Sequence, residues 1–392
     1  MTPSARIQAA IELLDQIVEA ARDKGAPADR LIAAYFKTRR YAGSKDRRAV
    51  RELVYLAVRH CGELPANGRA AMLALAQSDE TLVTLFDGSA HGPAAIIEGE
   101  EVAQAGLAPE WLVKALGASG VNGEAVQALL DRAPLDIRVN ALKADRETIE
   151  LPETGEPLAA SQALRFPTGT NVEQWPAYRD GQIEVQDHAS QLISEAIMAS
   201  PGDTILDLCA GAGGKTLALA ARFGNACRLI ASDTDKRRLG NLAPRAAKAG
   251  AQIDETVLLN PNEEMDALSA LAGGVDHALV DAPCSGSGTW RRNPESRWRL
   301  DRQELKRLNR LQDHVLDLAT KLVRSGGTLT YVTCSLLDAE GPDRFRAFLE
   351  RHADFTAETP DLPFGTARAG GVRLDPFHHG TDGFFVAIAR RA

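Results

Sequence analysis

The sequence has few cysteines and no long apolar run, and each shortage excludes a class of protein. Its five cysteines are an odd number without CxxC spacing, which argues against a disulfide framework and against a zinc knuckle. No apolar stretch reaches the roughly eighteen residues that cross a bilayer, so we expect no membrane partner. The first residues lack an apolar signal core and carry Glu12, Asp15 and Glu19, which predicts a cytoplasmic chain.

The chain also lacks a general positive charge. Its net charge of −8 argues against binding nucleic acid over the whole surface. Two segments are nevertheless basic: residues 37–51 (KTRRYAGSKDRRAVR), and residues 286–310, which carry eight Arg or Lys against three Asp or Glu. Both could be ordinary solvated faces, but their concentration on an acidic chain fits local phosphate contacts better.

The residue pattern changes along the 392-residue chain, which is too long for one core. Apolar residues at helical spacing predict an all-α domain over residues 1–88, and residues 89–104, rich in Gly and acid, read as a linker. Residues 105–180 predict a small α+β subdomain. From residue 181 to 392, short β-branched strands alternate with helical stretches, which predicts βαβ units and a mostly parallel sheet.

A glycine-rich turn, DLCAGAGGKT at residues 207–216, follows one of these predicted strands. It is not a Walker A loop, because Cys209 stands where that pattern needs glycine. It fits the dinucleotide fingerprint only in part, because Thr216 takes the place of the third glycine. Asp233, at the end of the next strand, can accept ribose hydroxyls, so the set favours a nucleoside cofactor with a small charged tail, such as S-adenosylmethionine. A structural turn or another nucleotide stays open.

Two further motifs lie at the ends of predicted strands: VDAPCSGSGTWRRNPESRW at residues 280–298 and YVTCS at residues 331–335. With the glycine turn they resemble the RNA cytosine-C5 methyltransferase family, which includes the bacterial ribosomal RNA methyltransferase B and the nucleolar NOP2/NSUN proteins. The resemblance runs from about residue 105 to the C-terminus and includes three more blocks: RVNALK (138–143), VQDHASQL (185–192) and DGFFVAIARR (382–391). Residues 1–88 are more loosely similar to the NusB-like RNA-binding domain of the bacterial branch.

This resemblance implies an α/β fold: a Rossmann-like, class I methyltransferase domain over residues 181–392, with a mostly parallel seven-stranded sheet. It implies S-adenosylmethionine as the cofactor and 5-methylcytosine in 16S ribosomal RNA as the product, with transfer RNA as the alternative substrate. We expect a monomer without a metal ion. From another class, a non-catalytic RNA-binding assembly factor remains the alternative.

The cysteines carry the expected chemistry. Cytosine C5 is a poor nucleophile, and adding a thiolate at C6 makes it electron-rich. Spacing alone leaves open whether Cys284 or Cys334 attacks, and buried strand-end thiols are the structural alternative. The resemblance assigns Cys334 as the nucleophile and Cys284 to release of the methylated base. It assigns Asp281 to the ring N3 and exocyclic amine, and Lys215 to the base or the cofactor tail.

The remaining candidates fall into two groups. For the cofactor we expect Cys209, Ala210, Gly211, Ala212, Gly213, Gly214, Lys215, Asp233, Arg238, Asn260 and Asp281. Asn260 or Asn262 stands where the family commonly has an acid, and DAEG at 338–341 replaces its usual Glu-Glu-Asn. For RNA we expect Arg138, Asn140, Arg291, Arg292 and Trp298, since guanidinium groups and aromatics read unpaired bases. Core packing is the alternative for Trp298.

Overall fold

A computed structural model describes residues 1–392, which form two compact units. The helical unit contains Met1–Asp131 and Ser285–Glu304, and the sheet unit contains Arg132–Cys284 and Leu305–Ala392. No helix is both long and apolar enough to cross a membrane.

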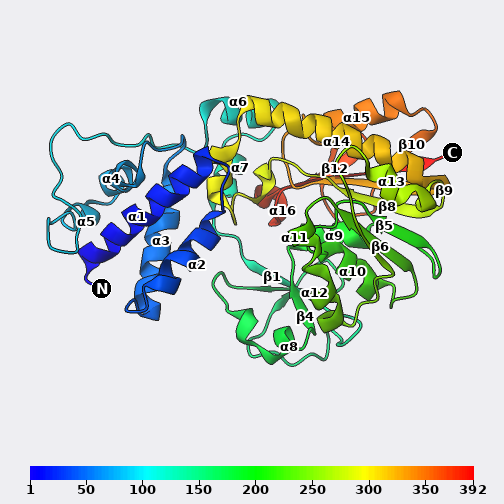
Figure 1. Ribbon diagram of the computed structural model, residues 1–392, viewed down its shortest axis with the longest axis horizontal. Helices are drawn as coiled ribbons and strands as arrows, with labels where there is room; N and C mark the ends of the chain where they lie inside the picture. Colours follow the sequence, from blue (N-terminus) through cyan, green and yellow to red (C-terminus); the bar gives the residue numbers. More distant parts are fainter. The chain divides into compact units, whose positions relative to one another are not determined.

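The helical unit is built around α1 (Pro3–Arg22), which lies beside α3 (Ser44–His60) in Figure 1. Apolar side chains of the two helices share one core. The Thr2 hydroxyl accepts a hydrogen bond from the Ala5 amide and Pro3 opens the helix, so α1 has a capped start. The other elements are α2 (Ala28–Thr38), α4 (Gly68–Ser78), α5 (Glu80–Val83), α6 (Glu110–Ala118), α7 (Glu124–Gln127) and the 3-10 turns η1 (Ala128–Leu130), η4 (Ser287–Thr289) and η5 (Pro294–Arg299).

The sheet unit begins with a small antiparallel sheet in the order β2-β3-β1-β4. Its strands are β1 (Leu135–Val139), β2 (Glu156–Pro157), β3 (Ala163–Phe166) and β4 (Ile183–Val185). Between β3 and β4 the chain forms η2 (Val172–Gln174) and α8 (Pro176–Arg179). Phe166 and Trp175 meet edge to face at 5.1 Å in its core.

A nine-stranded sheet forms the rest of this unit, in the order β11-β12-β13-β9-β8-β5-β6-β7 with β10 beside β13. The strands are β5 (Thr204–Asp207), β6 (Arg228–Asp233), β7 (Glu255–Leu258), β8 (Val275–Asp281), β9 (Val323–Thr333), β10 (Phe355–Glu358), β11 (Thr366–Arg368), β12 (Gly371–Leu374) and β13 (Phe384–Arg391). The α/β class is confirmed, with parallel pairing from β9 to β7. The expected count of seven strands is wrong, because short antiparallel strands extend the edge at β13.

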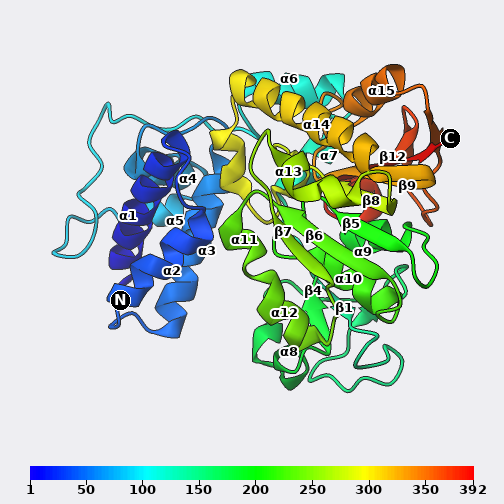
Figure 2. The same cartoon turned by 45° about the vertical axis from the view of Figure 1, so that its right-hand side comes forward.

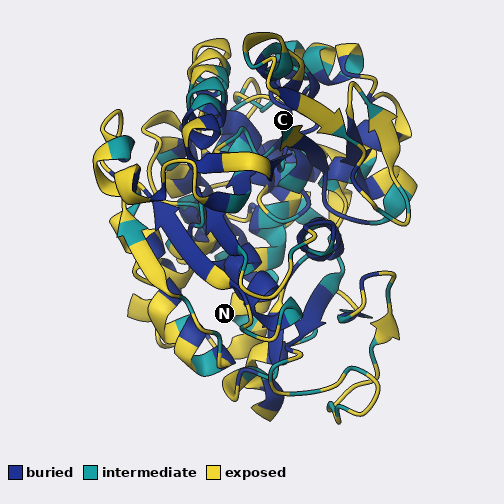
Figure 3. Cartoon of the chain, turned by 90° about the vertical axis from the view of Figure 1, so that its right-hand side faces the viewer, coloured by how far each residue is buried: buried dark blue, intermediate teal, exposed yellow.

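Helices cover both faces of this sheet (Figure 2). In the central strands β5 and β6, Leu206 and Ile230 pack on one face, while their neighbours Ile205 and Leu229 pack on the other. Successive residues of these two strands are therefore buried on both faces of the sheet (Figure 3). One face carries α13 (Glu264–Leu268), α14 (Arg302–Leu322) and α15 (Pro342–Arg351); the other carries α9 (His188–Glu195), α10 (Gly214–Arg222) and α12 (Leu242–Ala249). The short elements are α11 (Lys236–Leu239), η3 (Ser269–Leu271) and α16 (Pro376–His379).

The compact units differ from the predicted domains in two places. Residues 105–131, with α6 and α7, group with the helical unit, and not with the small sheet that follows them. Residues 285–304, expected inside the methyltransferase domain, also belong to the helical unit.

Candidate active site

The glycine turn links β5 to α10 in the conformation that its residues allow. Gly211 and Gly213 have φ angles of 57° and 82°, the left-handed region that other residues rarely adopt. A Cβ on Gly213 would also lie 2.2 Å from Leu242 Cδ1. At the end of β6, Asp233 Oδ2 accepts a hydrogen bond from the Gly211 amide at 2.7 Å, so the acid and the turn hold each other in place.

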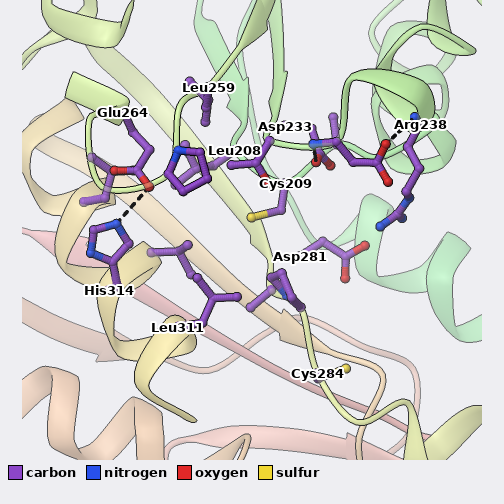
Figure 4. Close-up of a pocket in the computed structure, with 18 of the residues that line it drawn as sticks. Leu208, Cys209, Asp233, Arg238, Leu259, Glu264, Asp281, Cys284, Leu311 and His314 are labelled. Atoms are coloured by element: carbon purple, nitrogen blue, oxygen red, sulfur yellow. Dashed lines mark hydrogen bonds and ion pairs between the residues drawn. The ribbon is translucent and has the colours of Figure 1, made fainter. Parts of the chain in front are cut away.

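A pocket of about 860 Å³ opens beside this turn, at the carboxyl ends of the parallel strands. Figure 4 shows Asp233, Arg238 and Asp281 on one side of it and Glu264, His314 and Leu311 on the other. Its lining also includes Cys209, Ala210, Leu259, Pro261, Asn262, Cys284 and Cys334. The volume, the apolar wall and the strand-end acids fit a nucleoside with a charged tail. Of the two amides considered for the adenine, Asn262 lines the pocket and Asn260 does not.

An ion pair between a buried lysine and a half-buried aspartate lies at the strand ends beside the pocket. Lys215 Nζ donates to Asp281 Oδ2 at 2.6 Å, and the Lys215 side chain is only 9% exposed. Burial pulls the pKa of Lys215 down, but Asp281 and the charges of Cys334 and Asp207 together raise it overall. Lys215 therefore stays protonated, and its ammonium lies within electrostatic range of the Cys334 sulfur.

The two cysteines of the strand-end motifs meet. Cys284 Sγ and Cys334 Sγ are 3.3 Å apart, although fifty residues separate them in the chain. Both are half-buried and both line the pocket. Their strands are neighbours, with Asp281 of β8 paired to Val332 of β9, so the sheet register sets the meeting of the two sulfurs.

A buried carboxylate ties the two cysteine segments together. Glu340 is fully buried; its Oε2 accepts from Ser335 Oγ at 2.6 Å, and its Oε1 accepts from Gln312 Nε2 at 3.1 Å. The same Gln312 amide donates to the Pro283 carbonyl at 2.9 Å. One acid thus contacts the residue after Cys334 directly and the residue before Cys284 through one amide. Sequence reasoning gave Glu340 and Gln312 no role, because nothing local distinguishes them from solvated loop and helix residues.

The predicted RNA contacts of Trp298 and Arg291 are contradicted by their burial, at 6% exposure each. The Trp298 ring belongs to the core of the helical unit, and its Nε1 donates to the Cys61 carbonyl at 3.2 Å. Next to it, the fully buried Arg297 donates to the carbonyls of Val58 and Cys61 at the C-terminal end of α3. The aromatic and cationic residues of η5 therefore attach residues 285–304 to the helices. Arg292 is half-buried.

Arg138 and Asn140 are also buried, so their predicted RNA contacts are not available either. Arg138 Nε donates to Gln186 Oε1 at 2.7 Å. Asn140 Nδ2 donates to the carbonyls of Gly181 and Ala249 at 2.8 and 2.7 Å, which joins the small sheet to α12. The RVNALK block thus has an internal structural role.

Comparison with known proteins identifies a family and several relatives of this chain. A family model described as 16S rRNA methyltransferase RsmB/F matches residues 195–390. The probable ribosomal RNA small subunit methyltransferase B of Synechocystis sp. is 33% identical over 302 residues, covering 72% of this chain and 67% of the relative. Ribosomal RNA small subunit methyltransferase B of Xanthomonas campestris is 34% identical over 294 residues, covering 72% and 66%. The chain thus spans about two thirds of the length of these relatives.

Solved structures share the fold. The structure named PH0851 has a TM-score of 0.78 at 24% identity, covering 100% of this chain and 99% of that one. NSun6 from Pyrococcus horikoshii, solved with SFG, has a TM-score of 0.62 at 19% identity and covers 72% of this chain and 98% of its own. On its sequence matches, the chain belongs to the 16S rRNA methyltransferase RsmB/F family, and its methyl donor is S-adenosylmethionine.

Proposed function

We propose that this protein forms 5-methylcytosine in 16S ribosomal RNA through a covalent bond between Cys334 and cytosine C6. The observation that carries the proposal is the pair of sulfurs 3.3 Å apart, beside the Lys215–Asp281 ion pair at the end of the pocket. An RNA-binding protein without catalysis has no need for two thiols in contact with a nucleoside-sized pocket.

The pocket residues divide between cofactor and base. When bound, S-adenosylmethionine supplies an electrophilic methyl group on a positively charged sulfur. The Asp233 carboxylate would accept its ribose hydroxyls, and the open backbone at Gly211 and Gly213 would admit its amino-acid end near the start of α10. Leu259, Pro261 and Asn262 would enclose its adenine.

Cys334 performs the first step. Its thiolate attacks C6 of the flipped cytosine, forming the S–C6 bond and moving an electron pair toward C5 and N3. The thiolate is the reactive form of a cysteine, so this attack requires Cys334 to lose its proton. Asp281 would hold N3 and the exocyclic amine, and the proton that it shares with Lys215 can neutralise the charge that develops on N3.

Cys284 takes part in the second half of the reaction. Once C5 carries its methyl group, its proton must leave so that the S–C6 bond can break and aromaticity return. The Cys284 sulfur, 3.3 Å from Cys334, would as a thiolate accept the C5 proton, and the electron pair of the C5–H bond then expels the Cys334 thiolate from C6. Without it, the methylated base would stay attached to Cys334.

Bisulfite sequencing of 16S ribosomal RNA from cells with and without the gene tests the proposal. We expect a single cytosine that is protected in wild-type RNA and converted in the deletion strain. Complementation with wild-type protein should restore protection, and complementation with Cys334→Ala should not. An unchanged 16S ribosomal RNA pattern, with loss of protection in a transfer RNA instead, would contradict the proposed substrate.

A further inference from the structure

The two pocket thiols form a pair whose geometry suits a chemistry other than methyl transfer. A disulfide has an S–S bond of about 2.05 Å, only about 1.2 Å shorter than the 3.3 Å contact. The Ala282 amide donates to the Val332 carbonyl at 2.9 Å, so the segments that carry both cysteines leave adjacent strands side by side. Backbones of adjacent strands lie about 4.8 Å apart, which is compatible with a disulfide.

The pair is also accessible to an oxidant. Both sulfurs line an open pocket that admits small molecules. Burial disfavours the reactive thiolate at the other three cysteines. It raises the pKa of Cys61 to about 11, that of Cys209 well above its ordinary value, and that of Cys227 above its ordinary value.

From this geometry we infer that Cys284 and Cys334 form an oxidation site, which a peroxide converts into a reversible disulfide. The Cys334 thiolate attacks one peroxide oxygen, the O–O bond breaks, and a sulfenic acid and water result once a proton is taken up. The Cys284 thiolate then attacks the Cys334 sulfur, the S–S bond forms as the S–O bond breaks, and the hydroxide that leaves takes up a proton to become a second water. A dithiol reductant reverses the reaction by exchange and is itself oxidised to a disulfide.

The disulfide would switch off methyl transfer, and this consequence rests on the proposed function. With its sulfur bonded to Cys284, Cys334 has no free thiolate to add to cytosine. Cys284 would also protect the nucleophile, because a sulfenic acid captured as a disulfide is not oxidised further to the irreversible sulfinic acid. A thiol that serves in base release would thus have a second use as a resolving cysteine.

The test uses the full-length, reduced protein treated with hydrogen peroxide. We expect its intact mass to fall by two hydrogen atoms, and a non-reducing digest to contain one peptide pair that joins residues 284 and 334. Methyl transfer to 16S ribosomal RNA should fall by more than about tenfold and return after dithiothreitol. Cys227→Ser should behave like wild type, whereas Cys284→Ser should gain oxygen at Cys334 and form no cross-link.

The outcomes separate the two proposals. Oxidation of Cys334 to sulfinic acid without a cross-link, or no change in mass at peroxide doses that oxidise free cysteine, would overturn the inference. A cross-link that forms and reverses in a protein whose reduced form transfers no methyl group would leave the inference standing and contradict the proposed function.

Discussion

Removing the Glu340 carboxylate should loosen both cysteine segments at once. Glu340→Ala deletes two hydrogen bonds to a buried charged acceptor, from Ser335 and Gln312. Each such bond contributes about 1.5 to 3 kcal/mol, so the free energy of unfolding should fall by about 3 to 6 kcal/mol. Because the separation of the two sulfurs is no longer fixed, kcat should fall by about 100-fold, while KM for RNA stays near its wild-type value.

Glu340→Gln provides the conservative variant. Its carbonyl can still accept from Gln312, and its amide can donate to the Ser335 hydroxyl, which both donates and accepts. Only the charge is lost, so the stability should fall by about 1 kcal/mol and most of the kcat should return. Glu350→Ala, at an exposed position of α15, is the matched control and should change the stability by less than about 0.5 kcal/mol.

Urea unfolding followed by circular dichroism measures the stability, and methyl transfer under saturating RNA measures kcat. If Glu340→Ala unfolds at the wild-type urea concentration, the network does not support the fold. If its stability falls while kcat per folded molecule is unchanged, the network stabilises the sheet without positioning the thiols.

Three further predictions concern other parts of the chain. Burial raises the pKa of Asp207 from 3.8 to about 7, so the unfolded state loses this proton at a lower pH than the folded state. The free energy of unfolding should therefore decrease between pH 4 and 7, by at most roughly 4 kcal/mol. Asp207→Asn should flatten that decrease in urea titrations. Trp298→Ala should destabilise the helical unit by about 3 to 5 kcal/mol in thermal melts; a loss of RNA affinity at unchanged stability would restore the stacking role. Lys215→Met should lower kcat for methyl transfer, because it removes the ammonium that donates to Asp281; an unchanged kcat would show that this ion pair takes no part in the reaction.

The sequence predicted the glycine turn and the strand ends because both follow local rules. The strand, the left-handed glycines at 211 and 213 and the helix start are consecutive in the chain. Parallel strands also bring their carboxyl ends to one edge, which is why Cys284 and Cys334 could be expected near each other. The exact pairing of β8 with β9 then decides the contact, and only the structure supplies it.

The misread residues depend on contacts distant in sequence. Trp298 looks like an RNA-reading residue, and only its packing against the end of α3, more than two hundred positions earlier, shows that it helps to hold residues 285–304 in place. Glu340 was overlooked for the opposite reason: an acid in a loop is usually solvated, whereas this one is buried. Its burial against Ser335 and helix α14 follows from the tertiary arrangement of these segments, which no local pattern contains.

The assignment of the two thiols is tested most directly by trapping the covalent intermediate. Each variant is incubated with 16S ribosomal RNA and S-adenosylmethionine and then analysed on a denaturing gel for a protein–RNA adduct. We expect an adduct that accumulates with Cys284→Ala and is absent with Cys334→Ala. An adduct with Cys334→Ala and none with Cys284→Ala would contradict Cys334 as the nucleophile.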